Sequence, residues 1–547
     1  MFPPLAKIPE GASHLLTLLI LCPSLGALTL FLVPSKSEAL ARSVAVLFGL
    51  LTFALSVLVA WTFPVGSAEF QLLERTPWIN DFGINYIVGV DGLSLSMVLL
   101  TTFLSVLVLI SSGSISSKVR AYLGCLLFLE TGMLGTFLAL DGFTFYIFWE
   151  LMLIPMYFLI GVWGGSRKIY AALKFVIYTA LGSLLMLVAI VTLSYLHFKQ
   201  FGSYSFYLGD WTHLSIDSVR LELLLFAAFS LAFAIKVPMF PLHTWLPDAH
   251  VEAPTGGSVI LAGVLLKMGL YGMIRFCVPI FPAAVVATAP LFAFLGVVGI
   301  VYGALVAWVQ TDMKKLVAYS SVSHLGFCVL GYAALNLTGM QGAVLQMINH
   351  GISTAALFFL VGVLYDRTHT RRIADYGGVA AKVPLFAVVF LVFTLSSIGL
   401  PLTNGFIGEF LILRGGFEFS PVLGGFAVSG VVLGAVYMLS LYRRVVFGPV
   451  PASKGHDDHA HDLKDLTLRE KVVFLPLLVA VFILGLYPQP ILRLIEPSSK
   501  ASLAVLNNER MTQISAGGVA AVGAVKSDQQ DTGETEALAG GVRYGRL

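Results

Sequence analysis

Long apolar runs recur along almost the whole 547-residue chain and are separated by short polar links. A helix needs about 20 predominantly apolar residues to cross the hydrocarbon core of a bilayer. The pattern predicts about fourteen such spans: 15–33, 42–63, 92–111, 122–140, 143–163, 172–196, 222–245, 255–277, 283–309, 316–335, 341–364, 384–416, 421–446 and 472–488. The sequence therefore predicts an all-α polytopic membrane protein.

The composition agrees with this pattern. Hydrophobic residues make up 57% of the chain and charged residues only 12%, whereas soluble domains carry about 25% charged residues. A formal net charge of +3 favours no nucleic-acid partner. Most basic residues of the connecting loops fall on one side of the alternating spans, for example Lys118, Lys314 and Arg443. By the positive-inside rule this side is cytoplasmic, and both termini face outward.

Two predicted spans contain residues that break helices. The run 222–245 ends in KVPMFPLHTWLP, and the run 384–416 contains SSIGLPLTNGFIGEF. Proline removes a backbone donor and frees carbonyls that only water or neighbouring helices can satisfy. A structural kink packed against neighbours is the simpler interpretation of each break, and a transport pathway is the functional one.

The positions of the breaks predict an internal repeat. The two broken spans are the seventh and the twelfth, five apart, so units of spans four to eight and nine to thirteen must have opposite orientations. Broken helices at matching places of inverted repeats are typical of transporters. The predicted N-terminal unit of three spans covers 1–121, and the two inverted five-helix repeats cover 122–277 and 283–447. A His-rich cytoplasmic loop with the last span covers 448–490, and a polar, disordered tail covers 491–547.

Seven ionisable residues lie well inside apolar runs. A charge at the centre of a bilayer costs about 2.5–3.5 kcal/mol on insertion scales. For any single residue a structural ion pair, or a histidine satisfied by a carbonyl, is a reasonable alternative. Taken together, however, the set indicates a proton pathway: Glu130, Glu150, Lys236, Lys267, His324, His350 and Glu409.

These residue types suit a relay. Glu150 and Lys236 lie in spans of the same direction and could face one another, so the carboxylate would decide whether the buried lysine binds or releases its proton. Histidines titrate near neutrality and suit transfer between less willing groups. Glu409 follows about 25 residues after the start of its span, which at 1.5 Å per residue predicts a place in the outer half and a role in release.

No cofactor site is predicted. The four cysteines, at 22, 125, 277 and 328, lie apart in apolar runs, and no glycine-rich nucleotide motif follows a strand-like run. We therefore expect no redox centre and no bound metal. The segment HDDHAH, residues 456–461, could bind a metal, but a solvated charged loop is the preferred interpretation.

Several motifs resemble a known family. They are FWELMLIPMYFLIGVWG, KVPMFPLHTWLPDAHVEAPTGGSVILAGVLLKMGLYG, TDMKKLVAYSSVSHLGF and NGFIGEF. Over roughly residues 80–490 the chain resembles the chain M family of bacterial NADH:quinone oxidoreductase, respiratory complex I, which is homologous to mitochondrial subunit 4. Glu409, in place of the lysine usual in sibling antiporter-like subunits, favours this family over the siblings.

The resemblance implies an antiporter-like fold of fourteen helices with two inverted five-helix repeats. It implies that Glu150, Lys236, Lys267 and Glu409 carry protons, that His324 and His350 link the halves, and it leaves the role of Glu130 open. NADH, FMN, iron–sulfur clusters and ubiquinone or menaquinone are expected elsewhere in the complex. The implied partners are the other membrane-arm subunits, including sibling antiporter-like chains, and the implied location is the bacterial inner membrane.

Related chains leave alternatives open. Multisubunit cation/proton antiporters, membrane-bound hydrogenases and ferredoxin-linked complexes contain similar subunits. A secondary transporter for a small solute is a further alternative, but the polar groups form a line rather than a substrate pocket.

Overall fold

The computed structural model describes residues 2–5, 14–216, 218–449 and 463–530, and 79% of it is helical. The segment 456–461 and the last residues of the tail, 531–547, lie outside the described residues. The first α-helices are α1 (Leu15–Leu32), α2 (Glu38–Thr62), α3 (Gly92–Ser111), α4 (Val119–Leu138), α5 (Gly142–Leu151), α6 (Leu153–Trp163), α7 (Lys168–Phe201), α8 (Leu208–Trp211), α9 (Val219–Lys236) and α10 (Trp245–Glu252). The later ones are α11 (Thr255–Ile260), α12 (Lys267–Gly272), α13 (Val278–Ile280), α14 (Pro282–Trp308), α15 (Met313–Ala333), α16 (Leu337–Thr368), α17 (Val379–Lys382), α18 (Pro384–Ser397), α19 (Asn404–Phe419), α20 (Pro421–Tyr442), α21 (Leu468–Leu486) and α22 (Gln489–Gln530).

Shorter elements complete the fold. The π-helical turns are η4 (Leu261–Leu265), η5 (Met273–Cys277) and η7 (Arg443–Phe447). The 3-10 turns are η2 (Asn80–Phe82), η3 (Ser112–Ser114) and η6 (Ile373–Asp375), and the strands are β1 (Gln71–Ile79) and β2 (Ile84–Val90).

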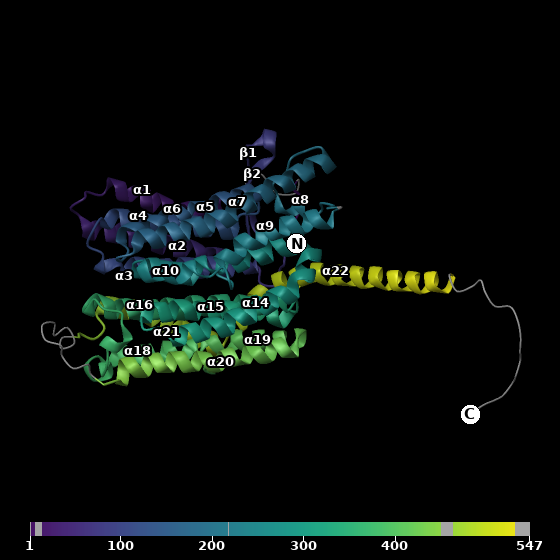
Figure 1. The fold of residues 1–547 in the computed structure, drawn as a ribbon. Coiled ribbons are helices and arrows are strands. Elements are labelled where there is room, and N and C mark those ends of the chain that lie inside the picture. Colours follow the sequence, from purple (N-terminus) through teal and green to yellow (C-terminus); the bar gives the residue numbers. More distant parts are fainter. Residues whose placement is uncertain (1, 6–13, 217, 450–462, 531–547) are drawn as a thin grey trace, which may run out of the picture.

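The long helices lie side by side in two groups (Figure 1). The first group, α1–α9, is drawn in purple to blue, and the second, α14–α21, in green. Helix α22 packs against α3, α14 and α16 and then extends beyond the bundle. The contacts of α22 therefore join the two groups.

The membrane architecture is confirmed. Within the described residues, 11 helical segments are long and apolar enough to cross a membrane, or 12 when the pair Leu468–Leu486 and Gln489–Glu509, bent by 69°, is counted as one. The predicted runs that do not correspond to one of these 11 segments are 222–245, 384–416 and 472–488, of which the first two carry the prolines discussed above. The number fourteen and the inverted repeat stay predictions.

Aspartates begin several of these helices. Asp91 caps α3 in a reciprocal arrangement with Ser94, Asp141 accepts hydrogen bonds from the first turn of α5, and Asp312 does so for α15. A carboxylate at this position satisfies backbone N–H groups that have no partner inside the helix. These caps fix where each span starts.

A two-stranded antiparallel hairpin, β1–β2, was not anticipated by the all-α prediction. Its turn includes Gly83, whose φ of 64° is left-handed and favours glycine. Glu74 of β1 reaches the start of α1, where its carboxylate accepts hydrogen bonds from Leu16 N at 2.7 Å and Thr17 N at 3.0 Å. Negative charge is stabilised at a helix N-terminus, so the hairpin anchors α1.

The prediction of a disordered tail from residue 491 is wrong for its first part, because α22 begins at Gln489. The polar composition hid an amphipathic pattern. Leu494, Ile495, Leu503 and Leu506 are buried at helical spacing, and they form the face that packs on the bundle.

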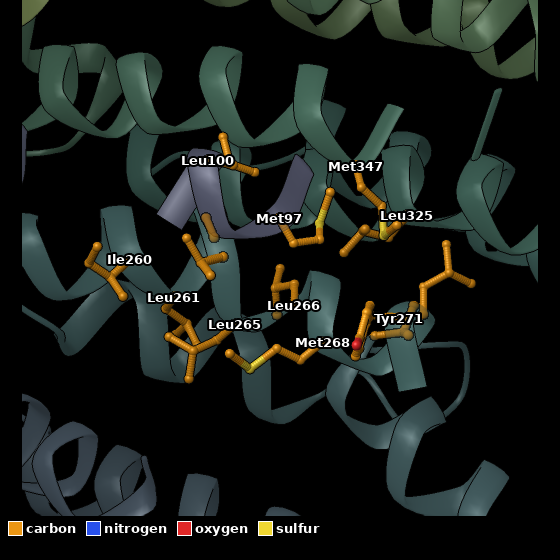
Figure 2. Packing of buried hydrophobic residues seen from close by; sticks show 14 of the residues in the cluster. Met97, Leu100, Ile260, Leu261, Leu265, Leu266, Met268, Tyr271, Leu325 and Met347 are labelled. Atoms are coloured by element: carbon orange, nitrogen blue, oxygen red, sulfur yellow. The ribbon is translucent and has the colours of Figure 1, made fainter. Parts of the chain in front are cut away.

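The segment Thr255–Ile280 lies at the centre of the protein. Every residue of its most apolar stretch is buried. Figure 2 shows side chains of this segment, such as Leu266, beside Met97 of α3. Because neighbouring helices surround this segment, any polar side chain on it must find its partners inside the protein.

Candidate functional site

The first break in a span comes directly after Lys236, the last residue of α9. The chain leaves the helix at Pro238 and Pro241 and resumes it at Trp245. The Trp245 indole N–H donates to the Ile235 carbonyl at 2.9 Å. A side chain thus satisfies a carbonyl near the end of the helix, as the interior of a membrane protein requires.

Lys236 is 1% exposed, and its ammonium nitrogen lies 4.9 Å from the centroid of the Trp149 ring. Its Nζ donates no hydrogen bond to any residue that the structure describes. The expected contact with Glu150 is therefore absent, although the charges of the two groups interact across the intervening space. Successive helix positions point about 100° apart, and it is Trp149, the residue before Glu150, whose ring lies against the lysine.

The helix that carries Glu150 is itself interrupted. Helix α5 ends at Leu151, Met152 forms a turn, and α6 begins at Leu153. Pro155 cannot donate to the carbonyl one turn earlier, which explains a weak point here. Each member of the predicted pair, Glu150 and Lys236, therefore lies beside a break in its helix.

Lys267 follows the π-helical turn η4 and is fully buried. Its Nζ donates to the Ala262 carbonyl and lies 2.7 Å from His350 Nδ1. A π-helical turn leaves carbonyls without their usual partners and is frequent at functional sites. The turn thus supplies one partner for Lys267, and α16 supplies the other.

His324 of α15 continues the line of polar groups. Its ring centroid lies 5.7 Å from that of His350, and its Nδ1 lies 2.9 Å from Glu409 Oε1. On the other side of the ring, His324 Nε2 lies 3.4 Å from both Ser397 Oγ and Tyr437 Oη. We call Lys267, His350, His324 and Glu409 the central string.

The structure therefore brings together four of the predicted residues from four different helices, α12, α16, α15 and α19. Lys236, at the break after α9, and Glu150, at the break between α5 and α6, have no hydrogen bond to these four residues. Glu130 of α4 is buried, and its carboxylate oxygens make no hydrogen bond within the described part of the chain. Glu130 does not join the central string.

The expectation that Glu409 lies in the outer half of its span is wrong. Both Ser397, at the end of α18, and Glu409 approach His324, which lies near the middle of α15. Between them the chain doubles back: Leu400 N donates to the Leu395 carbonyl. The prediction assumed a rise of 1.5 Å for every residue up to Glu409, but the residues between Ser397 and Glu409 do not advance along the membrane normal.

Sequence reasoning missed Gln346, whose Nε2 donates to Glu409 Oε1 at 3.0 Å. A signal was present, because Gln346, Asn349, His350 and Ser353 recur at helical spacing within an apolar run. Asn349 Nδ2 donates to the Asn404 carbonyl at 2.6 Å. This polar face of α16 therefore both contacts Glu409 and holds the start of α19.

A buried ion pair was also missed. Arg275 of η5 lies 2.5 Å from Asp91 Oδ1 and 3.2 Å from the Tyr271 hydroxyl. Burial alone would raise the pKa of Asp91, but the Arg275 guanidinium holds it below its usual value. The pair ties the start of α3 to the central segment.

A polar cavity of about 220 Å³ lies where α10 and α16 end and α15 begins. Glu252, Lys314, Asp366 and Arg371 line it among others, and Lys314 Nζ donates to the Ala253 carbonyl. His250, fully buried behind it, experiences the charges of both Lys314 and Lys267. The His250 ring stacks on Phe358 of α16, with the ring centroids 4.7 Å apart.

No group of three or more His, Cys, Asp or Glu side chains within the described ranges could hold a metal ion. The cysteines at 22, 125, 277 and 328 are all free thiols. The lysine, histidine and glutamate side chains of the central string can each bind and release a proton.

The chain matches the family described as "NADH:quinone oxidoreductase/Mrp antiporter, TM" over residues 139–434. It is 46% identical to NADH-quinone oxidoreductase subunit M of Rhodobacter capsulatus over 468 residues, 84% of this chain and 89% of the relative. It is 42% identical to NADH-ubiquinone oxidoreductase chain 4 of Marchantia polymorpha over 482 residues, 88% of this chain and 95% of the relative.

Solved structures agree. A chain of respiratory complex I from Thermus thermophilus with bound NADH has a TM-score of 0.81 and 32% identity, covering 90% of this chain and 99% of that one. A chain of the Mrp complex from Dietzia sp. DQ12-45-1b, at 21% identity and a TM-score of 0.77, shares the fold over 90% of this chain and 100% of that one. The chain therefore belongs to the NADH:quinone oxidoreductase/Mrp antiporter transmembrane family, in the branch of subunit M and chain 4.

Proposed function

We propose that this chain is a proton-translocating subunit in the membrane arm of an NADH:quinone oxidoreductase, where quinone reduction elsewhere in the complex drives the protons. The observation that carries the proposal is the central string. A lysine, two histidines and a glutamate from four helices lie in sequence across a buried interior. A structural ion pair would need only two of them.

Each contact suits one proton step. A proton on Lys267 Nζ can pass to His350 Nδ1 across 2.7 Å, and a proton on His324 Nδ1 can pass to Glu409 Oε1 across 2.9 Å. The two imidazoles, with centroids 5.7 Å apart, are close enough for one ordered water or a ring rotation to join them.

Lys236 is the proposed switch. Its charge is opposed by burial and supported from a distance by Glu150. Because the helix is interrupted directly after Glu150, a small change at Met152 would move the carboxylate toward Lys236 or away from it. Approach favours a bound proton on the lysine, and retreat favours its transfer toward Lys267.

The polar cavity is the proposed site of proton uptake. Lys314 lines the cavity and Lys267 belongs to the string, while His250 interacts with both. The positive-inside count puts this end of the spans in the cytoplasm, with both termini outside. Release would start from Glu409.

The finer architecture is part of the proposal. We infer about fourteen spans with two inverted five-helix repeats, over 122–277 and 283–447, which the matching breaks after Lys236 and Ser397 support. We also infer that this chain holds no redox centre, and that NADH, FMN, iron–sulfur clusters and quinone bind to other subunits. The relatives' names support neighbours that include further antiporter-like chains.

The proposal is tested on the whole complex in proteoliposomes by measuring proton uptake and quinone reduction together. Lys267→Ala should lower proton translocation by at least about 10²-fold, the usual effect of removing a proton-transfer group, and an uncoupler should not restore it. Lys471→Ala changes an exposed lysine at the start of α21 and serves as the control. Translocation at the wild-type ratio in an assembled Lys267→Ala complex would contradict the proposal.

A further inference from the structure

A groove of about 570 Å³ opens on the outer surface between α1, α4 and α6, away from the central string. Its walls are apolar and include Phe31, Phe128, Ile154 and Phe158, which are 80%, 37%, 59% and 46% exposed. Such side chains are stable in contact with hydrocarbon, so the groove faces lipid. The proposed proton pathway makes no use of it.

Small residues make the groove hollow. Gly124 and Cys125 of α4 line it, and a methyl group added at Gly124 would meet no atom within 4 Å. In a membrane, a void of this size is filled by an acyl chain or by a neighbouring helix, because an empty space forfeits dispersion contacts.

One end of the groove is basic. Lys118 and Arg120 line it at the start of α4, together with Glu38 at the start of α2. Glu38 lies 3.5 Å from Arg42, which offsets its charge, and Arg120 donates only to the Val33 carbonyl at 2.5 Å. Lys118 is exposed, and its ammonium forms no ion pair or hydrogen bond with the described residues. The end therefore carries a net positive charge of two (Lys118, Arg120 and Arg42, less Glu38).

The dimensions fit one leaflet. From Lys118 to Phe128 the helix rises about 15 Å at 1.5 Å per residue, half of the about 30 Å hydrocarbon core. A basic end followed by an apolar trough of this length matches a phospholipid with an anionic headgroup. A zwitterionic headgroup would leave the basic end uncompensated.

We propose that this groove binds one anionic phospholipid, with its headgroup at Lys118 and Arg120 and an acyl chain along Gly124, Cys125 and Phe128. Binding of this phospholipid differs from the contact of bulk lipid in two ways. It depends on the charge of the headgroup, and it depends on the hollow at Gly124.

The test uses the whole complex in proteoliposomes that contain phosphatidylglycerol with a photoreactive diazirine on one acyl chain. After illumination, mass spectrometry of peptides maps the adducts. We expect adducts on the segments 121–128 and 154–158, and few adducts there with the matching phosphatidylcholine probe. Replacing Lys118 and Arg120 by Gln should lower the phosphatidylglycerol yield roughly fivefold for each charge removed.

Gly124→Leu adds a side chain whose Cβ meets no atom within 4 Å; it should fill the hollow and lower the yield with phosphatidylglycerol by about tenfold, while the assembled complex remains intact. Gly425→Leu is the matched control, because a side chain at this glycine of α20 also meets no atom within 4 Å. Equal yields with the two headgroups, or an unchanged yield in Gly124→Leu, would overturn the proposal. So would cross-links from Cys125 to another subunit, which would show that a protein helix fills the groove.

Discussion

His324 Nδ1 lies 2.9 Å from Glu409 Oε1, although 85 positions of sequence separate the two residues. The contact exists because the break between α18 and α19 brings Glu409 back to the middle of α15. Glu409 is thus the end of a buried string and not a group near the outer surface.

Glu409→Gln should abolish coupled proton translocation through this chain. The amide has nearly the same shape and can still contact His324 and Gln346, but it cannot take up or release a proton. We expect proton transfer through this chain to slow by about 10²-fold or more, so that the protons moved per quinone reduced fall by this chain's share. Glu418→Gln, on the same helix but paired with Arg414 at the surface, should behave as wild type.

Gln346→Leu should weaken the same end of the string without removing a titratable group. Its amide donates to Glu409 at 3.0 Å, and a hydrogen bond to a charged group contributes about 1.5–3 kcal/mol. We expect translocation about tenfold slower, with an altered pH–rate profile. Gln341→Leu changes a less buried glutamine of α16 and should alter neither quantity. An unaltered profile in Gln346→Leu would mean that Gln346 is only a packing residue.

Lys236→Arg should impair translocation nearly as much as Lys236→Ala. Arginine keeps the charge above Trp149 but does not release its proton in proteins. The measurement is the proton-to-quinone ratio of each variant in proteoliposomes. Lys174→Arg keeps the surface pair with Asp248 and is the control. Full translocation in Lys236→Arg would show that Lys236 acts only as a fixed charge.

Glu150→Gln should also abolish translocation, and Glu150→Asp should retain part of it, because the charge moves by about one methylene. The two variants distinguish an electrostatic role from a packing role, since Gln preserves the volume and Asp preserves the charge. Assembly is checked by the NADH-oxidising activity of the complex with a soluble acceptor. Normal coupling in Glu150→Gln would exclude the switch.

Asp141, which precedes α5, should make stability depend on pH. Burial raises its pKa to about 7, while hydrogen bonds from Phe143 N and Thr144 N oppose the rise. The folded protein thus binds a proton more tightly than the unfolded chain, so the contribution to stability is full at low pH. It is lost as the pH rises from about 4 to about 7.

Asp141→Asn should flatten this dependence, because the amide oxygen still caps α5 but does not titrate. The measurement is the thermal midpoint of the purified complex between pH 5 and pH 8. A slope equal to that of the wild type would show that another group is responsible.

Hydropathy and proline spacing were enough to predict the membrane class, most spans and the breaks after Lys236 and Ser397. The hairpin β1–β2 was missed because strands of nine and seven residues carry little weight between long apolar runs. Helix α22 was missed because the prediction for this segment rested on its polar composition and not on the periodicity of its apolar residues.

In the site, the burial of charge pointed to the correct residues but not to their contacts. Which side chain of α5 contacts Lys236 depends on helix rotation, which the sequence does not define: the lysine lies over the Trp149 ring and forms no hydrogen bond with Glu150. The depth of Glu409 depends on the path of the loop after Ser397, which rise per residue does not capture.

The π-helical turn η4 has a consequence for insertions and deletions. A turn that closes from Leu266 N to the Leu261 carbonyl holds one residue more than an α-helical turn. Removing one residue from 261–265 would restore a regular α-helix. The helical residues before the deletion would then be rotated by about 100° about the helix axis relative to Lys267. Either α12 would then lose its packing against α9 or Lys267 would lose its contact with His350. The length of this short segment is therefore under a constraint that no single side chain in it reveals.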